Sequence, residues 1–296
     1  MSTQVMIIGG GPAGISAAIQ LTRLGRSVLL FESGRLGGML HEANLVENYP
    51  GFPKGVAGPR LAKLMIRHLE AQEVEVVHDH VAKLVVNRKQ IKVKTSNGHE
   101  YQAPILVLAT GTIPGPWEMP RIVGNVNHLI YRDVATLSDQ KGRTFAVIGS
   151  GDAAFDYAMN LSRNNHVILC SRTNGEKSLL LLRKRVERNE SIEWHKRAYL
   201  GKIEQVDEQL RLSWIDPSGT WTSDVDGLVA AVGRIENNRL LESIPEERRE
   251  SVLEEGRLLL IGDVVNGRQR QTAIAVGDGM RAAMQIDHLI GKEIAK

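Results

Sequence analysis

The sequence predicts an α/β fold with two domains, one inserted into the other, and a repeated pattern leads to this prediction. In residues 5–14 an apolar run is followed by a glycine-rich turn and the start of a helix, and residues 145–154 repeat this order. The spacing is G-x-G-x-x-G or G-x-G-x-x-A, whose small residues allow a tight turn and a close approach of a pyrophosphate. We therefore expect two Rossmann-like domains, each holding one dinucleotide at a helix N-terminus.

The context of the first turn makes it a specific signal. A helix-like stretch over residues 15–24 leads to a second strand over residues 27–31, and Glu32 follows that strand. An acid at this place hydrogen-bonds the ribose of a bound adenosine, whereas an ordinary surface glutamate is the alternative. The second copy has no such acid, because Ser171 and Arg172 follow its strand. An arginine there suits a 2′-phosphate better than a free ribose hydroxyl.

The order of the remaining strands sets the domain boundaries. After each βαβ unit come short strands separated by polar turns, which predicts a small β-meander in each domain. The strand over residues 258–261 and the helical stretch over residues 270–290 complete the first domain rather than the second. We therefore expect a discontinuous domain of residues 1–113 and 239–296, with a second domain of residues 114–238 inserted into it.

Composition and charge exclude several classes of protein. The chain is 42% hydrophobic and 24% charged, and no apolar run approaches the roughly 20 residues of a membrane span. No basic segment precedes the first apolar run, so we expect no secretory signal and a cytoplasmic location. Lys and Arg number 37 against 34 Asp and Glu, a mildly basic balance, and the basic run at residues 183–188 favours a solvated helix face over a nucleic-acid site. An acidic protein partner remains possible.

The cysteine and histidine content argues against disulfides and metal sites. Cys170 is the one cysteine of the chain, so no intramolecular disulfide can form and paired thiolate ligands are excluded. His78 and His80 could share a face of a strand, but no third ligand lies nearby in sequence. We expect neither a metal nor a reactive thiol, and interpret Cys170 as a small, partly buried residue.

In order along the chain, these motifs resemble the low-molecular-weight thioredoxin reductase family and its relatives, which include thioredoxin-reductase-like ferredoxin–NADP reductases. The resemblance covers nearly the whole chain and implies glutathione-reductase-type domains, FAD in the first, a nicotinamide dinucleotide in the second, and a homodimer. The positions that it assigns to FAD are Gly9, Gly11, Pro12, Ala13, Gly14, Glu32, Gly38, Met39, Asn48, Val81, Ala109, Thr110, Gly111, Asp263, Arg270, Gln271 and Thr272. Those that it assigns to NAD(P) are Gly149, Gly151, Asp152, Ala153, Ser171, Arg172, Lys177, Val232 and Gly233.

The chain departs from the family at the redox-active cysteine pair. Thioredoxin reductases carry C-x-x-C before the second glycine turn, and the aligned positions here are Arg132 and Ala135. A dithiol relay needs one thiolate to attack and a second to resolve the mixed disulfide. The chain is therefore expected to have no catalytic protein residue, because the flavin carries the chemistry.

Two further departures concern the cofactor contacts. Family members that use NADPH commonly carry His-Arg-Arg-x-x-x-Arg, and the first, second, third and last of these aligned positions are Cys170, Ser171, Arg172 and Glu176. Arg172 with Ser171 and Lys177 could still bind a 2′-phosphate, so NADPH is favoured and NADH stays an alternative. Met39 stands where a glutamine often follows the paired glycines, which puts that flavin contact in question.

The sequence thus predicts an FAD-dependent NAD(P)H oxidoreductase that passes electrons to an external acceptor. A small acidic electron-transfer protein, ferredoxin or flavodoxin, is the favoured acceptor, and a quinone or another small molecule is the alternative. A nucleotide-responsive flavoprotein with little turnover is a rival of another class, supported by the missing dithiol and the reduced phosphate clamp.

Overall fold

The structure is a computed structural model and describes residues 3–294. Its contacts divide the chain into two compact units. Unit 1 comprises the chain up to His41, Val46–Ile113 and the chain from Glu236 onward, and unit 2 comprises Glu42–Leu45 and Pro114–Ile235. The sequence places the second boundary after residue 238, whereas the structure places it after Ile235. The assignment of Glu42–Leu45 to unit 2 has no counterpart in the sequence prediction.

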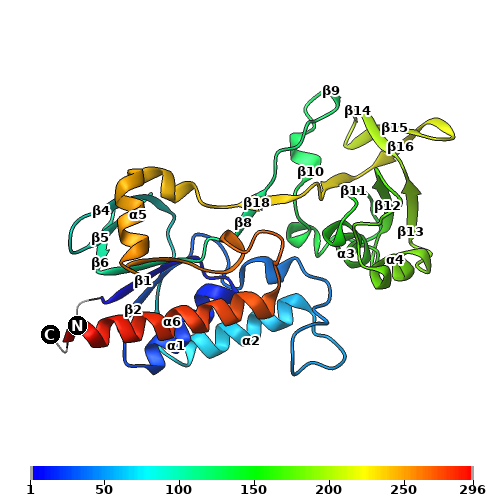
Figure 1. The fold of residues 1–296 in the computed structure, drawn as a ribbon. Coiled ribbons are helices and arrows are strands. Elements are labelled where there is room, and N and C mark those ends of the chain that lie inside the picture. Colours follow the sequence, from blue (N-terminus) through cyan, green and yellow to red (C-terminus); the bar gives the residue numbers. More distant parts are fainter. Residues whose placement is uncertain (1–2, 295–296) are drawn as a thin grey trace. The chain divides into compact units, whose positions relative to one another are not determined.

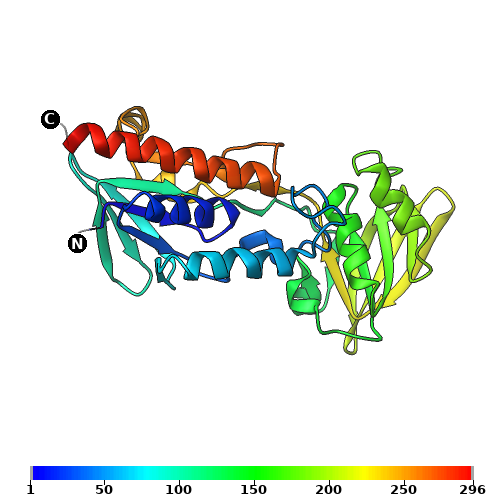
Figure 2. The same cartoon turned by 90° about the horizontal axis from the view of Figure 1, so that it is seen from below.

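Unit 1 is built on a parallel sheet with the strand order β19-β7-β1-β2-β3. Alternate residues of its apolar strands enter two separate cores, so that Ile7 belongs to one and Ile8 to the other. Helices α1, α2 and α6 lie side by side against one face, and the meander β4-β5-β6 and α5 belong to the other side (Figures 1 and 2). The strands are β1 (Val5–Ile8), β2 (Val28–Phe31), β3 (Glu75–Val77), β4 (Val81–Val86), β5 (Ile91–Thr95), β6 (Glu100–Ala103), β7 (Ile105–Leu108) and β19 (Leu258–Leu260). The helices are α1 (Pro12–Arg23), α2 (Gly58–Glu70), α5 (Glu246–Glu254) and α6 (Thr272–Ile294).

Unit 2 repeats this plan with the strand order β10-β17-β11-β12-β13. Helices α3 and α4 pack on one face of the sheet, and the meander β14-β15-β16 packs on the other around the fully buried Trp214 (Figure 1). The strands are β9 (Arg121–Val123), β10 (Ile130–Tyr131), β11 (Thr144–Ile148), β12 (His166–Ser171), β13 (Ile192–Lys196), β14 (Tyr199–Val206), β15 (Gln209–Asp216), β16 (Gly219–Val225) and β17 (Gly227–Ala230). The helices are α3 (Asp152–Leu161) and α4 (Leu180–Glu187).

Short elements connect and complete the two units. A two-stranded sheet of β8 (Thr112–Pro114) and β18 (Arg234–Glu236) forms where the chain passes between them. The 3-10 helices are η1 (Gly38–His41), η2 (Asn127–Leu129), η3 (Ala135–Leu137), η4 (Arg239–Ser243) and η5 (Gly262–Val264). These short elements matter for the site, because η1, η3 and η5 contain or adjoin predicted functional positions.

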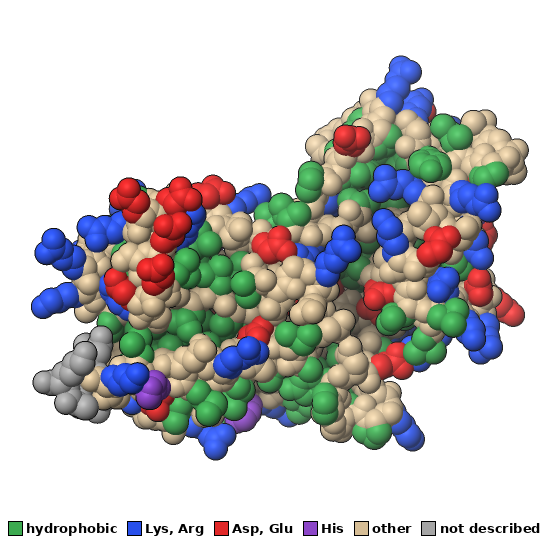
Figure 3. All heavy atoms as spheres, viewed as in Figure 1, with side chains coloured by type: hydrophobic (Ala, Val, Ile, Leu, Met, Phe, Trp, Pro, Cys, Tyr) green, Lys and Arg blue, Asp and Glu red, His purple; other side chains and the backbone are tan. Residues whose placement is uncertain are grey.

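The surface agrees with the modest charge of the sequence. Acidic side chains gather over α5, whose one buried residue is Val252, whereas Lys and Arg on the visible face of unit 2 are interspersed with acids (Figure 3). Within residues 3–294, no helix has the length and apolar character that crossing a membrane requires. The same described residues contain no group of three or more His, Cys, Asp or Glu side chains placed to hold a metal ion.

Candidate dinucleotide sites

The glycine turn after β1 combines one tightly packed position with one open position. Gly9 has φ +108°, and a Cβ there would lie 2.3 Å from the Ala109 carbonyl oxygen, at the end of β7. A Cβ on Gly14 would lie 1.9 Å from the Gly9 carbonyl oxygen. Gly11 differs, because its φ of −77° suits any residue and a Cβ there would meet nothing within 4 Å. The backbone needs glycine at Gly9 and Gly14, whereas at Gly11 glycine keeps space open for a ligand.

This open space has the donors that a pyrophosphate requires. Pro12 and Ala13 begin α1, and no side chain caps the N-terminus of that helix. The amide N–H groups of its first turn are therefore available to an anion, and the helix dipole favours negative charge there. A Cβ on Gly38 in η1 would lie 3.2 Å from the Gly11 Cα, so η1 borders the same space. The residues present thus fit the phosphates of a dinucleotide.

Glu32, at the end of β2, lies against the same turn. One carboxylate oxygen accepts a hydrogen bond of 2.7 Å from the Gly10 N–H, and the other accepts one of 2.7 Å from the Gly34 N–H. Each oxygen keeps a further lone pair that can accept from a ribose hydroxyl. The position expected of a ribose-binding acid is therefore fixed before any ligand arrives.

The residues that follow β19 also lie beside the start of α1. Gly262 has φ +72°, and a Cβ there would lie 2.8 Å from the Ala13 side chain, which places η5 and its Asp263 beside the start of α1. Asn48 donates a hydrogen bond of 2.7 Å to the Gln271 side chain.

The other positions predicted to bind FAD spread over unit 1. Ala109 follows β7, Thr110 donates to the Asn237 carbonyl, Gly111 has φ +62°, and Arg270 forms an ion pair with Glu236. Thr272 begins α6, Met39 is partly exposed in η1, and the Val81 side chain is buried at the start of β4. Ala109 therefore lies against the turn after β1, as Glu32 and Gly38 do, whereas Val81 belongs to the meander.

The turn after β11 in unit 2 has the same geometry as the turn after β1. A Cβ on Gly149 would lie 2.4 Å from the carbonyl oxygen of Ala231, just beyond β17. At Gly151 the φ is −104°, and a Cβ would again meet nothing within 4 Å. Asp152 and Ala153 begin α3, and an Asp152 oxygen accepts from the Leu179 N–H at 2.7 Å. Val232 and Gly233 follow Ala231 in the chain, and the Gly233 carbonyl accepts a hydrogen bond from the Gly115 N–H. A second open space for phosphates therefore exists in unit 2.

Ser171 has contacts that the sequence does not predict. Strand register pairs Ile8 with Phe31 and Ile148 with Cys170, so Ser171 occupies the position of Glu32 in the repeat. Its side chain is fully buried, donates to the Thr173 carbonyl at 2.8 Å and accepts from the Trp194 indole N–H at 2.9 Å. The Ser171 hydroxyl thus has structural contacts within unit 2, and its contact with the dinucleotide stays a prediction.

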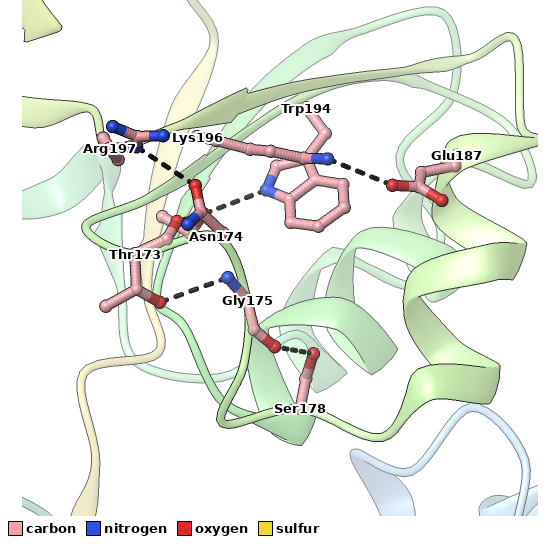
Figure 4. A network of polar contacts seen from close by, with 9 residues as sticks. Thr173, Asn174, Gly175, Ser178, Glu187, Trp194, Lys196 and Arg197 are labelled. Carbon is pink, nitrogen blue, oxygen red and sulfur yellow. Dashed lines mark hydrogen bonds and ion pairs between the residues drawn. The ribbon is translucent and has the colours of Figure 1, made fainter. Parts of the chain in front are cut away.

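The loop after β12 is held in one shape by the Trp194 side chain (Figure 4). Gly175 has φ +81°, and a Cβ there would lie 2.8 Å from the Trp194 ring. Ser178 donates to the Gly175 carbonyl at 2.8 Å, and Arg197 donates to the Asn174 side chain at 3.1 Å. Lys196 lies 4.1 Å from the centroid of the Trp194 ring and 3.1 Å from a Glu187 carboxylate oxygen. No spacing in the sequence indicates this role of Trp194.

This fixed loop presents charges of both signs to solvent. Arg172, Lys177 and Glu176 are all exposed. Hydrogen bonds from its own backbone N–H and from the Asn174 and Thr173 side chains lower the pKa of Glu176, so it is ionised at neutral pH. Arg172 and Lys177 are thus the cations of this loop that are exposed to a 2′-phosphate, and the Glu176 carboxylate lies on the same loop.

The two positions aligned with the missing cysteine pair have other contacts. Arg132 donates to the Gly115 carbonyl at 2.7 Å, and its guanidinium lies 5.8 Å from the centroid of the Trp117 ring. The Ala135 N–H donates to a Glu42 oxygen at 2.8 Å. Cys170 is only 2% exposed on β12, and burial raises the pKa of its thiol. The sequence offers no signal for the Glu42 contact.

Two equivalent turns, each with open space at its second glycine and free N–H groups at a helix start, define a protein that binds two dinucleotides. Residues 3–279 match the family of pyridine nucleotide-disulphide oxidoreductases, and the chain belongs to that family. Its cofactors are accordingly FAD and a nicotinamide dinucleotide, and the chain is a flavoprotein oxidoreductase of the thioredoxin-reductase-like type.

Comparison with individual proteins agrees with this assignment. The chain is 27% identical to the thioredoxin reductase of Bacillus subtilis (strain 168) over 305 residues, which cover 97% of this chain and 94% of that protein. Its fold is similar to that of the Lactococcus lactis thioredoxin reductase, with a TM-score of 0.84, 23% identity, and coverage of 98% of this chain and 100% of that one. The bacillithiol disulfide reductase Bdr of Bacillus cereus has a TM-score of 0.73 at 18% identity, with coverage of 97% and 99%.

Proposed function

We propose that the chain is an FAD-dependent NAD(P)H oxidoreductase that passes electrons to an acceptor outside the chain, without a protein dithiol. The supporting observation is the number and position of cysteines in the chain. Cys170 is the one cysteine and is buried, and Arg132 and Ala135 stand where the relatives' family carries its cysteine pair. A relay through the protein needs two thiols, one of them ionised and accessible. Electrons therefore leave directly from the flavin.

The residues of the chain bind and orient the two dinucleotides. When bound, FAD would accept a hydride from the reduced nicotinamide and then release two electrons to an oxidant. In unit 1 the first turn of α1 would hold the pyrophosphate of FAD, Glu32 would accept a hydrogen bond from the adenosine ribose, and Asp263 would accept one from the sugar chain next to the flavin ring. In unit 2 the first turn of α3 holds the pyrophosphate of NAD(P)H, and Arg172 with Lys177 contacts a 2′-phosphate.

The acceptor that we favour is a small acidic electron-transfer protein, ferredoxin or flavodoxin. The excess of Lys and Arg over Asp and Glu supports this choice, because opposite net charges accelerate the encounter of two proteins. A small molecule such as a quinone is the alternative acceptor. As in the family that the sequence resembles, we expect a homodimer, and we expect it in the cytoplasm.

Anaerobic stopped-flow mixing tests the first step. The FAD-loaded protein is mixed with NADPH and, separately, with NADH, and the loss of oxidised flavin absorbance is followed. We expect rapid bleaching by at least one of them, with NADPH the faster. If neither bleaches the flavin, the protein is not an NAD(P)H oxidoreductase, and the nucleotide-responsive flavoprotein becomes the better description.

A second mixing step identifies the acceptor. The reduced protein is mixed with a ferredoxin, a flavodoxin, a quinone or oxidised thioredoxin. Flavin reoxidation by ferredoxin or flavodoxin at a rate that falls with ionic strength is the expected result. Reoxidation by thioredoxin at a comparable rate would contradict the proposal, because it would require a dithiol that the chain does not contain.

A further inference from the structure

An arginine from outside the loop after β12 lies at the same edge of the unit 2 sheet as Arg172. Strands β12 and β13 pair in parallel and end at Ser171 and Lys196, which lie opposite each other. Arg172 and Arg197 are the next residues. The backbones stay together beyond the strands, because the Arg197 N–H donates to the Thr173 carbonyl at 3.4 Å. Two cations therefore follow adjacent strands at the carboxyl edge of the sheet, where ligands bind in folds of this kind.

The equivalent position in unit 1 holds an acid. The residue before the first glycine of each turn aligns, through the second strand, with Val77 in unit 1 and with His195 in unit 2. Asp79 and Arg197 each lie two residues beyond these positions. The charge after the third strand is thus reversed between the two units. A negative group suits a ligand with free ribose hydroxyls, whereas a positive group suits one with a 2′-phosphate.

The Arg197 guanidinium is exposed and has donors left for a ligand. Its Nε donates to the Asn174 side chain at 3.1 Å, so the N–H groups of both terminal nitrogens are still available. The neighbouring Lys196 pairs with Glu187 at 3.1 Å and lies against the Trp194 ring (Figure 4). Within residues 3–294, Arg197 forms no such ion pair. Its charge is therefore available to an anion, whereas that of Lys196 is neutralised.

The backbone of Arg197 has a conformation that arginine disfavours. Its φ is +55°, in the left-handed region that glycine and asparagine adopt more readily. The Asn174 side chain that accepts from Arg197 also forms a hydrogen bond with the Glu176 carboxylate. One amide thus holds the cation and the carboxylate separately. Since folding alone favours glycine or asparagine at such a position, the arginine points to a role in binding.

We propose that Arg197 is a specificity-determining residue of unit 2, whose guanidinium binds the 2′-phosphate of NADPH together with Arg172. It supplies from the end of β13 a positive charge that the aligned positions Ser171 and Glu176 do not supply. Hydrogen bonds between guanidinium and phosphate are charge-assisted, and a free ribose hydroxyl offers no equivalent partner. The inference rests on the proposed function, because it requires unit 2 to bind a nicotinamide dinucleotide.

Binding measured without turnover tests this role. Isothermal titration calorimetry of the FAD-loaded protein gives the Kd values for NADP⁺ and NAD⁺, neither of which can donate a hydride. Arg197→Asn should weaken NADP⁺ binding about tenfold and leave NAD⁺ binding nearly unchanged, because the phosphate is the group that differs. Lys141→Asn removes an exposed cation before the start of β11, at the opposite edge of the sheet, and should leave both Kd values unchanged.

Two further measurements separate a contact with phosphate from an effect on the loop. Arg197→Lys keeps the charge, so its Kd for NADP⁺ should lie between those of the parent and Arg197→Asn. Asparagine tolerates the left-handed backbone, so Arg197→Asn should unfold in denaturant at a midpoint close to that of the parent. Equal losses of NADP⁺ affinity in Arg197→Lys and Arg197→Asn would overturn the inference, because the charge would then have no effect.

The ratio of the two Kd values decides the assignment. A ratio in Arg197→Asn equal to that of the parent would overturn it, whether both affinities fall or neither does. Flavin reduction by NADPH in the parent tests the proposed function separately. If reduction fails while the parent still binds NADP⁺ more tightly than Arg197→Asn does, the proposed function fails and the assignment of Arg197 stands. If the parent binds neither dinucleotide, both are overturned.

Discussion

Replacing Asp156 by asparagine should make the stability of unit 2 less dependent on pH. The Asp156 carboxyl lies on α3, where burial raises its pKa from 3.8 to about 6, against the opposing effects of the Asn44 N–H and the Arg163 charge. Between these two pKa values the native state keeps a proton that the unfolded chain has released. Stability therefore falls as the pH rises through this window, and the loss is complete above pH 6.

The magnitude follows from the pKa difference. A difference of about 2 in pKa corresponds to about 3 kcal/mol in the free energy of unfolding. In Asp156→Asn the amide oxygen can still accept from Asn44, but it carries no charge to be buried. Relative to the parent protein, the variant should therefore gain up to about 3 kcal/mol on going from pH 4 to pH 7.5. The neighbouring ionisable groups are the same in both proteins, so their effects largely cancel in the difference; they are Glu42, Asp133, Tyr157, Arg163 and Arg234.

Denaturant unfolding followed by tryptophan fluorescence measures this effect in unit 2 alone. The four tryptophans of the chain, Trp117, Trp194, Trp214 and Trp221, all belong to that unit. The exposed Asp139→Asn serves as the matched control and should show no such pH-dependent difference. If Asp156→Asn and the parent differ by the same free energy at both pH values, burial does not govern the ionisation of Asp156, and the reasoning is refuted.

Two further predictions concern the dinucleotide sites. Gly11→Val should fold but lose FAD and give colourless protein, because a Cβ there enters open space that the pyrophosphate needs. Gly151→Val should keep its yellow colour but lose flavin reduction by NAD(P)H. Full colour in the first variant or normal reduction in the second would contradict the assignment. Arg172→Ala should raise the KM for NADPH about tenfold and leave the KM for NADH nearly unchanged, and equal effects on the two would mean that Arg172 does not contact the 2′-phosphate.

Local motifs predicted the two turns well, because their geometry depends on residues close together in sequence. Gly9 and Gly149 each pack against a carbonyl just beyond the adjacent parallel strand, which is what the G-x-G spacing implies. The burial and hydrogen bonds of Ser171 were not predicted, for the opposite reason. Its burial depends on Trp194 of β13, 23 residues away, and no periodicity in the sequence connects the two.

The contact of Glu42 with η3 and the position of β9 were missed for a related reason. Glu42 accepts a hydrogen bond from Val134, 92 residues away, and β9 joins β14 in parallel although 81 residues separate their paired positions. Contacts of this kind depend on how whole elements pack, so composition and spacing within a window contain no information about them. The sequence did indicate that residues 232–233 and 262–264 matter, but only the structure shows that η5 reaches α1.

The repeat within the chain separates what the fold requires from what the function selects. Four strands of each sheet correspond, β7-β1-β2-β3 and β17-β11-β12-β13, and both sheets place an open glycine at the start of a helix, so phosphate binding is a property of the shared scaffold. The halves diverge immediately after the second strand, where Glu32 faces the first turn and Ser171 turns inward beneath Trp194. We therefore expect the exposed charges of the loop after β12 to discriminate between NADPH and NADH.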